Sequence, residues 1–234
     1  MRLLVTGGAG FIGSNFIHYW LRKHPEDQLI NLDLLTYAGN LANLEDIANQ
    51  ANYRFVQGDI ADYAVVDGLM GQVDCVVNFA AETHVDRSIG DGLSFVKTNI
   101  QGTANLLEAA RRHGGVRFHQ ISTDEVYGDL TRHDPKFDET SPYRPSSPYS
   151  ASKAAADHLV RAYFRTYKLP VTISNCSNNY GPYQFPEKVI PLFVTNLIDG
   201  LKVPLYGNGG NIRDWIHVDD HNAGIEAILQ RGQI

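Results

Sequence analysis

The chain has 234 residues, 43% of them hydrophobic, and a formal net charge of −6 from 26 acidic and 20 basic side chains. That length and composition suffice to bury one large core without crosslinks. The basic residues form no stripe that could release counterions from DNA or RNA, and no apolar run suits a signal peptide or a bilayer span. We therefore expect no nucleic-acid or membrane partner and a cytoplasmic location, with Cys75 and Cys176 as reduced core thiols.

Short runs rich in β-branched residues alternate along the chain with longer helical patterns. Several of these runs are apolar at both alternating positions, as expected for strands that helices cover on both faces. The alternation is typical of βαβ units, so we predict an α/β fold with a parallel sheet. The predicted strands lie within residues 2–6, 28–33, 53–59, 74–80, 116–123 and 171–177.

Two stretches depart from this alternation. Residues 129–148 are polar and rich in proline, which predicts a long surface loop and a candidate wall of an active site. Beyond Asn178 the pattern loosens into segments typical of a substrate lobe, followed by a final helix. We predict a domain of residues 1–177 that carries cofactor and catalytic residues. A smaller, incomplete substrate lobe of residues 178–234 would follow it, with its last helix returning to the main domain.

A glycine-rich motif follows the first predicted strand. The sequence GGAGFIG satisfies G-x-G-x-x-G at Gly8, Gly10 and Gly13, and G-x-x-G-x-x-G when counted from Gly7. Because a helix begins directly after it, its backbone N–H groups suit the pyrophosphate of a dinucleotide. Asp33 lies 20 residues beyond Gly13 and can accept hydrogen bonds from ribose hydroxyls. A 2′-phosphate would be repelled there, so we predict NAD and a Rossmann-like, doubly wound sheet.

A predicted helix within residues 146–164 carries the motif Tyr-x-x-x-Lys. Ser147 is its expected N-cap and Pro148 its first residue. The spacing of Tyr149 and Lys153 places both side chains on one helix face, where we expect the ammonium group to lower the tyrosine pKa toward that of a useful base. Together with NAD, this pair could remove a proton and a hydride from a secondary alcohol.

Two adjacent carboxylates, Asp124 and Glu125, follow the fifth predicted strand. Adjacent side chains on a strand point to opposite faces, but the twisting backbone at a strand end could aim both acids at one ligand. Just before them, Ser122 and Thr123 could bind a substrate hydroxyl. If an alcohol is oxidised to a ketone, loss of the neighbouring proton and of a β-hydroxyl needs one base and one acid. The alternative for the two acids is a solvated turn.

Four motifs, TGGAGFIG, NFAAETHVDRS, YSASK and NNYGP, together resemble the extended short-chain dehydrogenase/reductase superfamily over essentially the whole chain. The combination of STDEVYGD, AAETHVDRS, NCSNNYGPYQFPEKVIPLF and IRDWIHVDDH is similar to the dTDP-glucose 4,6-dehydratase family. This resemblance implies oxidation at C4, elimination of water across C5 and C6, and hydride return to C6. It assigns catalytic roles to Thr123, Tyr149 and Lys153, with Glu125 as the base. Asp124 would be the acid, kept protonated by the like charge beside it.

The resemblance also implies which positions bind the two ligands. Residues expected to contact NAD are Gly7, Gly10, Phe11, Ile12, Gly13, Asp33, Asp59, Ile60, Ala80, Ala81, Thr98, Tyr149, Lys153 and Asn179. Residues expected to contact the nucleotide sugar are His84, Thr123, Asn178, Lys188, Val189, Pro204, Tyr206 and Arg213. A homodimer is implied through helices from residues 95–113 and 154–168. No metal is expected, since the two histidines of HVDDH lack a third ligand.

Several alternatives stay open at this point. Asp59 could be only a turn residue, and Arg213 could form an ion pair with Asp214 instead of binding a diphosphate. The substrate could be another nucleotide sugar, such as UDP-glucose, because base contacts cannot be decoded from one sequence. An epimerase has no use for the two acids. Family members continue well beyond residue 234, so the chain could be a fragment, or a catalytically silent NAD-binding module.

Overall fold

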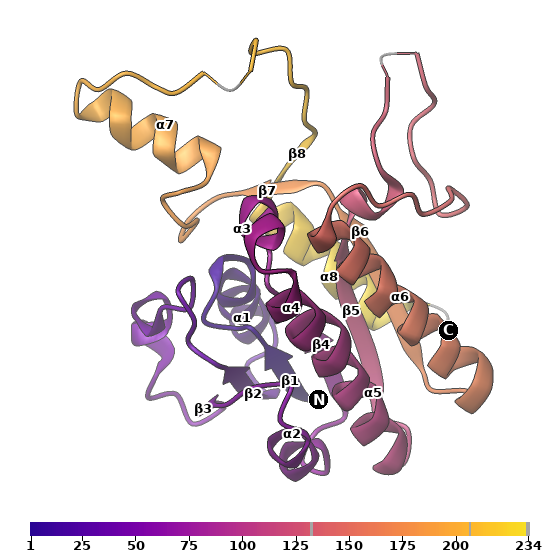
Figure 1. The fold of residues 1–234 in the computed structure, drawn as a ribbon. Coiled ribbons are helices and arrows are strands. Elements are labelled where there is room, and N and C mark those ends of the chain that lie inside the picture. The colour runs from indigo at the N-terminus through magenta and orange to yellow at the C-terminus, as the bar shows by residue number, and fades with distance from the viewer. Residues whose placement is uncertain (132, 206, 233–234) are drawn as a thin grey trace.

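A parallel sheet of six strands forms the centre of the computed structural model, which describes residues 1–131, 133–205 and 207–232 (Figure 1). The strand order is β3-β2-β1-β4-β5-β6, so each predicted strand and the parallel α/β arrangement are confirmed. The strands are β1 (Arg2–Thr6), β2 (Gln28–Asp33), β3 (Tyr53–Gln57), β4 (Cys75–Asn78), β5 (Arg117–Thr123) and β6 (Val171–Cys176). The order reverses between β1 and β4, where doubly wound sheets bind ligands.

Helices cover both faces of the sheet because successive side chains of a strand point to opposite faces. On one face, Leu4 of β1 packs with α2 (Tyr63–Met70), α5 (Thr103–Arg112) and α6 (Pro148–Tyr167). On the other face, Leu3 and Val5 pack with α1 (Phe11–Lys23), the 3-10 helix η1 (Leu41–Ile47) and α8 (Val218–Arg231). All three β1 side chains are fully buried, so the core lies on both sides of this strand.

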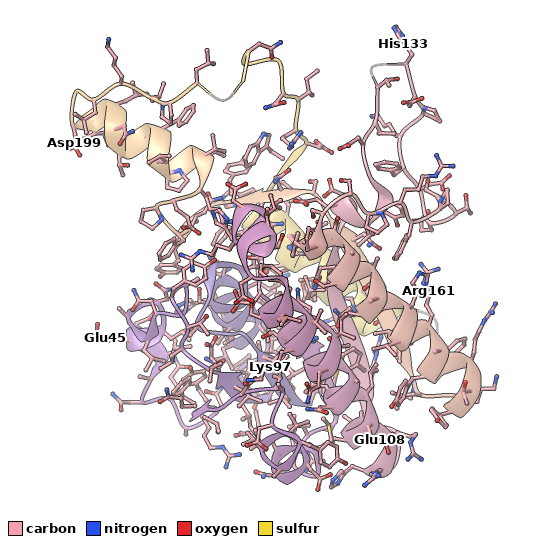
Figure 2. The ribbon with its side chains drawn as sticks, in the orientation of Figure 1. Glu45, Lys97, Glu108, His133, Arg161 and Asp199 are labelled. Carbon is pink, nitrogen blue, oxygen red and sulfur yellow. The ribbon has the colours of Figure 1, made fainter. Side chains whose placement is uncertain are left out.

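Four consecutive helical segments over residues 85–112, here called the helical rod, precede β5 on the first face. The helical rod runs through α3 (Val85–Gly90), α4 (Gly92–Phe95), a π-helical segment (Val96–Gly102) and α5, where a single helix from residues 95–113 was predicted. Lys97 and Glu108 mark its course in Figure 2. In the π-helical segment Asn99 turns inward to donate to Ser152 Oγ of α6 at 2.8 Å, which ties the rod to the helix carrying Tyr149.

The C-terminal part of the chain leaves the sheet and then returns. β7 (Asn178–Tyr180) pairs in parallel with β8 (Trp215–His217), and α7 (Val189–Ile198) projects at the periphery with no buried residue (Figure 1). α8 then packs against α1 and contributes Ile225 and Leu229 to the core beneath the sheet. The division into domains at residue 177 stays a prediction.

Both cysteines are free thiols, with Cys75 buried in β4 and Cys176 at the end of β6. Burial raises the pKa of the Cys75 thiol to about 12, so this side chain behaves as a small apolar core residue. Among the residues that the structure describes, no helix combines the length and the hydropathy that crossing a membrane requires.

Candidate active site

The loop between β1 and α1 forms a close-packed cradle. Gly7 has φ of +69°, and a Cβ there would lie 2.7 Å from backbone atoms of Ala80. A Cβ on Gly13 would lie 2.3 Å from the Gly7 carbonyl oxygen. Gly10 is the N-cap of α1 and supplies no capping side chain, so the first N–H groups of the helix remain available to an anion. Only glycine fits this cradle at Gly7 and Gly13.

A single cavity of about 380 Å³ opens at the carboxyl end of the sheet, beside this cradle. Its volume lies in the range of small-molecule sites. It brings together twenty of the residues predicted to be catalytic or to contact NAD or substrate. They are Gly7, Gly10, Phe11, Ile12, Gly13, Asp33, Asp59, Ile60, Ala80, Ala81, Thr98, Thr123, Asp124, Glu125, Tyr149, Lys153, Asn178, Asn179, Lys188 and Val189.

Two aspartates line the half of the cavity nearest the glycines. Asp33 ends β2, and its carboxylate accepts from the backbone N–H of Ala9 at 2.9 Å and of Leu35 at 2.8 Å. Asp59 lies beyond the end of β3 instead of in it, where it accepts from Ala61 N–H at 2.8 Å and pairs with Lys97 at 2.9 Å. Asp59 is therefore a turn residue and a lining residue at once, while Asp33 is held rigidly at the cavity.

Asp124 and Glu125 lie on a 3-10 turn (η3, Asp124–Tyr127) that begins directly after β5. The prediction that strand twist aims both acids at one ligand was wrong, because β5 already ends at Thr123. Thr123 caps the turn: its hydroxyl accepts from Glu125 N–H at 3.2 Å and donates to Asp124 Oδ1 at 3.3 Å. A helical turn rotates neighbouring side chains by less than a strand does, so both carboxylates line one cavity.

Burial raises the pKa of both acids above the ordinary carboxyl range. For Asp124, burial is the largest cause, and the charge of Asp214 adds to it. For Glu125, burial is followed by repulsion from Asp124, while Arg213 and Lys188 act in the opposite direction. We predicted that repulsion between the two acids would raise the pKa of Asp124. Repulsion instead raises the pKa of Glu125, and the pKa of Asp124 is raised mainly by burial. Burial therefore disfavours the ionised form of both carboxyl groups.

α6 presents Tyr149 and Lys153 to the same cavity. Ser147 caps this helix with Pro148 at its start, as predicted, and Ser150 completes a capping box. The predicted lowering of the tyrosine pKa is wrong: burial, then the charge of Glu125, raise the pKa of Tyr149. Lys153 Nζ instead donates to the Ile121 carbonyl at 2.6 Å, and burial lowers the pKa of the lysine.

Ser122 does not reach a substrate with its hydroxyl. Its Oγ donates to Asp157 Oδ2 at 2.6 Å inside the protein, and the residue is 3% exposed. Thr123 therefore remains the hydroxyl at this strand end that lines the cavity together with Tyr149. The predicted pair of substrate-binding hydroxyls reduces to one.

The predicted substrate residues of the C-terminal segments are only partly brought together. His84 lies outside the lining and approaches Glu187 Oε1 at 3.6 Å. Pro204 and Arg213 do not line the cavity either, because the chain between α7 and β8 runs outward in an exposed loop (Figure 1). Arg213 forms no ion pair with Asp214 within the described residues. Tyr206 lies outside the residues that the structure describes.

The loop of residues 129–148 was expected to form a wall of the site, and this expectation was wrong. None of its described residues lines the cavity, and its tip at His133 points away from the sheet (Figure 2). At the base of the loop, Phe137 and Tyr143 pack on Tyr127, and this packing directs the loop away from the cavity.

Several lining residues escaped the sequence analysis. Tyr37, Phe185 and Glu187 line the cavity, and Arg87 lies over the Tyr37 ring at 3.6 Å while Tyr37 meets Phe185 edge to face. Thr83 and Trp215 line it as well. Their positions next to predicted residues, Glu187 beside Lys188 above all, were the available signal, but which side chain of a loop turns inward is decided by tertiary packing.

Comparison with known proteins places this geometry in a family. A family model described as GDP-mannose 4,6 dehydratase matches residues 4–234. A dTDP-glucose 4,6-dehydratase from Mycobacterium tuberculosis is 57% identical over 235 residues, which cover 100% of this chain and 70% of that protein. The chain belongs to the dTDP-glucose 4,6-dehydratase family. It spans about 70% of the length of the curated relatives it matches.

Solved structures of the dTDP-glucose 4,6-dehydratase family share the fold throughout this chain. The enzyme from Streptomyces venezuelae, solved with NAD and dTDP bound, is 53% identical with a TM-score of 0.96, and the match covers 100% of this chain and 73% of that one. The enzyme from Bacillus anthracis, solved with NAD, is 49% identical with a TM-score of 0.93 over the same shares. The family membership therefore rests on sequence and on structure.

Proposed function

We propose that the chain is an NAD-dependent hydro-lyase that converts dTDP-glucose into dTDP-4-keto-6-deoxy-glucose. The observation that carries this proposal is the presence of Asp124 and Glu125 in one cavity with Tyr149 and the glycine cradle. An enzyme that only oxidises a sugar alcohol needs the tyrosine alone. Two further carboxylates with raised pKa values supply the acid and the base of an elimination.

The residues present fit NAD. Gly7, Gly10 and Gly13 leave room for a pyrophosphate at the open N-terminus of α1, and Asp33 lies rigidly at the position that ribose hydroxyls require. Asp59, Ile60, Ala80, Ala81, Thr98 and Asn179 complete the assigned contacts. When bound, NAD supplies hydride chemistry, taking up a hydride from C4 of the sugar and returning it to C6.

Tyr149 acts as the base at the C4 hydroxyl in this proposal. It accepts the hydroxyl proton as the C4 hydride departs, and Thr123 holds the sugar oxygen in place. Its raised pKa must fall for this step, and the two charges that can lower it are the Lys153 ammonium on α6 and the positive nicotinamide ring. Phe95, whose ring lies 6.3 Å from that of Tyr149, helps to exclude water.

Elimination follows at the next two carbons. Glu125 removes the C5 proton, which the C4 ketone has made acidic, and Asp124 gives a proton to the departing C6 hydroxyl so that water leaves. As the hydride returns to C6, the Glu125 carboxyl gives a proton back to C5, which comes from solvent when Glu125 has exchanged. Lys188 lies close enough to Glu125 that each influences the pKa of the other. We assign substrate binding to Asn178, Lys188 and Val189 in the cavity. His84 and Arg213 are assigned to the diphosphate-sugar at its margin.

We propose a homodimer and a cytoplasmic location as well. Leu93 is 80% exposed and Ile89 is 74% exposed on the helical rod, which supports an apolar contact between two copies. Free thiols at Cys75 and Cys176 fit a reducing compartment. We also keep the division into residues 1–177 and 178–234 as a proposal, supported by the separate pairing of β7 with β8.

The experiment is to incubate the chain with NAD and dTDP-glucose in D2O and to follow the sugar by NMR. A 4-keto-6-deoxy product with deuterium at C5 is the expected result. UDP-glucose and GDP-mannose in parallel tubes test the choice of nucleotide. Binding of NAD without any change in the three sugars would overturn the proposal in favour of a silent NAD-binding module.

A further inference from the structure

Asp157 is a fully buried carboxylate that the proposed reaction does not use. It lies on α6 one turn beyond Lys153, on the same buried face of the helix. Buried carboxylates are rare unless other groups pair with them, and this one lies below the catalytic pair, away from the substrate cavity. Its location therefore calls for a function other than binding substrate.

Three segments of the chain meet at this carboxylate, namely α6, β5 and the loop of residues 129–148. Asp157 Oδ2 accepts from Ser122 Oγ of β5 at 2.6 Å and from Tyr143 Oη of the 129–148 loop at 3.0 Å. Asp157 Oδ1 is buried without a partner among the described residues. A protonated carboxyl would carry a donor with nothing to accept it, so this arrangement suits the ionised, acceptor-only form.

Lys153 needs a counter-charge, and Asp157 is the carboxylate that supplies it. The ammonium group is buried and donates to the neutral Ile121 carbonyl, and no described carboxylate lies within 4.0 Å of it. Burial lowers the lysine pKa, and Asp157 leads the groups that raise it, ahead of Cys176. Without such a charge, a buried lysine tends to lose its proton.

The charged and titratable groups around this pair are few. Burial raises the pKa of Asp157, while the charge of Lys153, hydrogen bonds from Ser122 and Tyr143, and the charge of Arg161 all favour its ionised form. Lys153 faces Asp157 and the Cys176 thiol. Tyr149, the group that the lysine serves, faces Glu125, Cys176 and Asp124. The helical rod packed on α6 presents the neutral Asn99 to Ser152 there. Asp157 is thus the one carboxylate in this set that favours the charged lysine.

We propose that Asp157 is a positioning residue for the reaction. Its carboxylate keeps Lys153 charged and joins the catalytic helix to β5 and to the base of the 129–148 loop. The proposal rests on the proposed function for its kinetic consequence only. In the first hydride transfer, loss of this charge weakens the support for the Tyr149 phenolate. The acid limb of the pH profile then moves to higher pH, and the alkaline limb, set by Lys153, moves to lower pH.

The test compares the full chain with Asp157→Asn, and uses Ser122→Ala and Tyr143→Phe as matched controls. The controls each remove one hydrogen bond but leave the carboxylate charge in place. Lysine labelled with ¹³C at Cε reports the titration of Lys153 by NMR, with the signal assigned by its loss in Lys153→Met. We expect the midpoint to fall by about one pH unit in D157N and by much less in either control.

An unchanged Lys153 midpoint in D157N would overturn the proposal, whatever the sugar chemistry of the chain. Failure of the proposed function would show instead as absence of turnover in the parent. Should D157N fail to fold, ¹³C-labelled aspartate in the parent and in Lys153→Met supplies the reciprocal measurement. Asp157 is expected to be ionised at neutral pH in the parent and to titrate at higher pH in K153M. A carboxyl group that is already protonated in the parent would contradict the proposal.

Discussion

Two carboxylate clusters in this chain have opposite electrostatic environments. Asp124 and Glu125 are half-buried at the cavity with no ion pair in the described residues, and their pKa values are raised. Glu226 of α8 accepts from Tyr19 Oη at 2.6 Å, Lys23 Nζ at 2.7 Å and His24 Nε2 at 2.8 Å. Burial opposes ionisation of Glu226, but these hydrogen bonds outweigh it and lower its pKa to about 2.

This difference separates the two cavity acids, which have a role in the reaction, from Glu226, which has a role in stability. Hydrogen bonds from three donors keep Glu226 ionised at neutral pH, so it does not exchange protons there. Its role is to hold α8 against α1. Within the described residues no charged donor bonds to the cavity acids, and Asp124 accepts from the Thr123 hydroxyl alone among side chains, so burial raises the pKa values of both acids. Substitution of one cluster should therefore affect turnover, and substitution of the other should affect unfolding.

The largest expected effect is on turnover in Glu125→Gln. Loss of the C5 base should lower kcat by about 10²- to 10⁴-fold while C4 oxidation persists, because general-base catalysis contributes that much. Steady-state kinetics with product analysis measures it. Glu226→Gln is the matched control, since it makes the same chemical change on α8. Equal losses in the two variants would contradict the separation of roles.

Tyr149→Phe should suppress the step before elimination. Without the phenol, the C4 hydroxyl keeps its proton, and we expect the first hydride transfer to slow by a similar factor of about 10² to 10⁴. Stopped-flow absorbance of the reduced cofactor in a single turnover measures this step. A normal absorbance burst followed by stalled elimination would assign Tyr149 to a later step than the one proposed.

A smaller effect is expected on stability in Glu226→Gln. Loss of the charged acceptor should lower the free energy of unfolding by about 1 to 3 kcal/mol at neutral pH. Because the folded pKa is depressed, the stabilisation by Glu226 is present above the unfolded pKa and is lost as pH falls toward about 2. The difference in urea unfolding between parent and variant should shrink over that window.

Glu108→Gln is the control for this comparison. Glu108 also has a pKa lowered to about 2, first by the hydrogen bond from Arg111, but its charged partners Arg111 and Arg112 lie on the surface of α5, and its contact with α6 is a single long hydrogen bond from Tyr163 at 3.3 Å. Exposed pairs on one helix contribute little, so its loss should be clearly smaller than that of Glu226. A larger loss at Glu108 would show that the clamp between α8 and α1 is not the stabilising feature.

The smallest expected effect is a gain in stability instead of a loss. Asp124→Asn and Glu125→Gln should each raise the Tm slightly near about pH 8, because each removes a half-buried charge that has no ion-pair partner in the described residues. Folding raises the pKa values of both acids, so their ionisation destabilises the parent as pH rises through the folded pKa values. Below the unfolded pKa both acids are protonated in both states and cause no destabilisation. Calorimetric scans should show the gain disappear near about pH 4.

The parts of the fold that depend on local pattern were predictable from the sequence. Runs such as residues 2–6 and 28–33 became β1 and β2, and Ser147 with Pro148 began α6. The glycine cradle was also predictable, because its spacing reflects a steric requirement at Gly7 and Gly13 that the structure bears out. In these places each local preference agrees with the final fold.

The rest depends on contacts between distant residues. Nothing in the local sequence indicates that Ser122 turns inward to Asp157, that Lys153 bonds the Ile121 carbonyl, or that Glu226 meets three donors from α1. For the same reason the sequence predicted a lowered pKa for Tyr149, whereas the structure shows a raised one. The burial of Tyr149 and the approach of Glu125 are properties of the assembled site.

One time course tests the separation of chemistry from stability most directly. The parent, Glu125→Gln and Glu226→Gln are each mixed with NAD and dTDP-glucose in D2O, and NMR follows the C4 ketone and the deuterium at C5. The account predicts C5 deuterium in the parent and in E226Q, and a ketone without C5 deuterium in E125Q. Deuterium entering C5 in E125Q at the rate of the parent would contradict it.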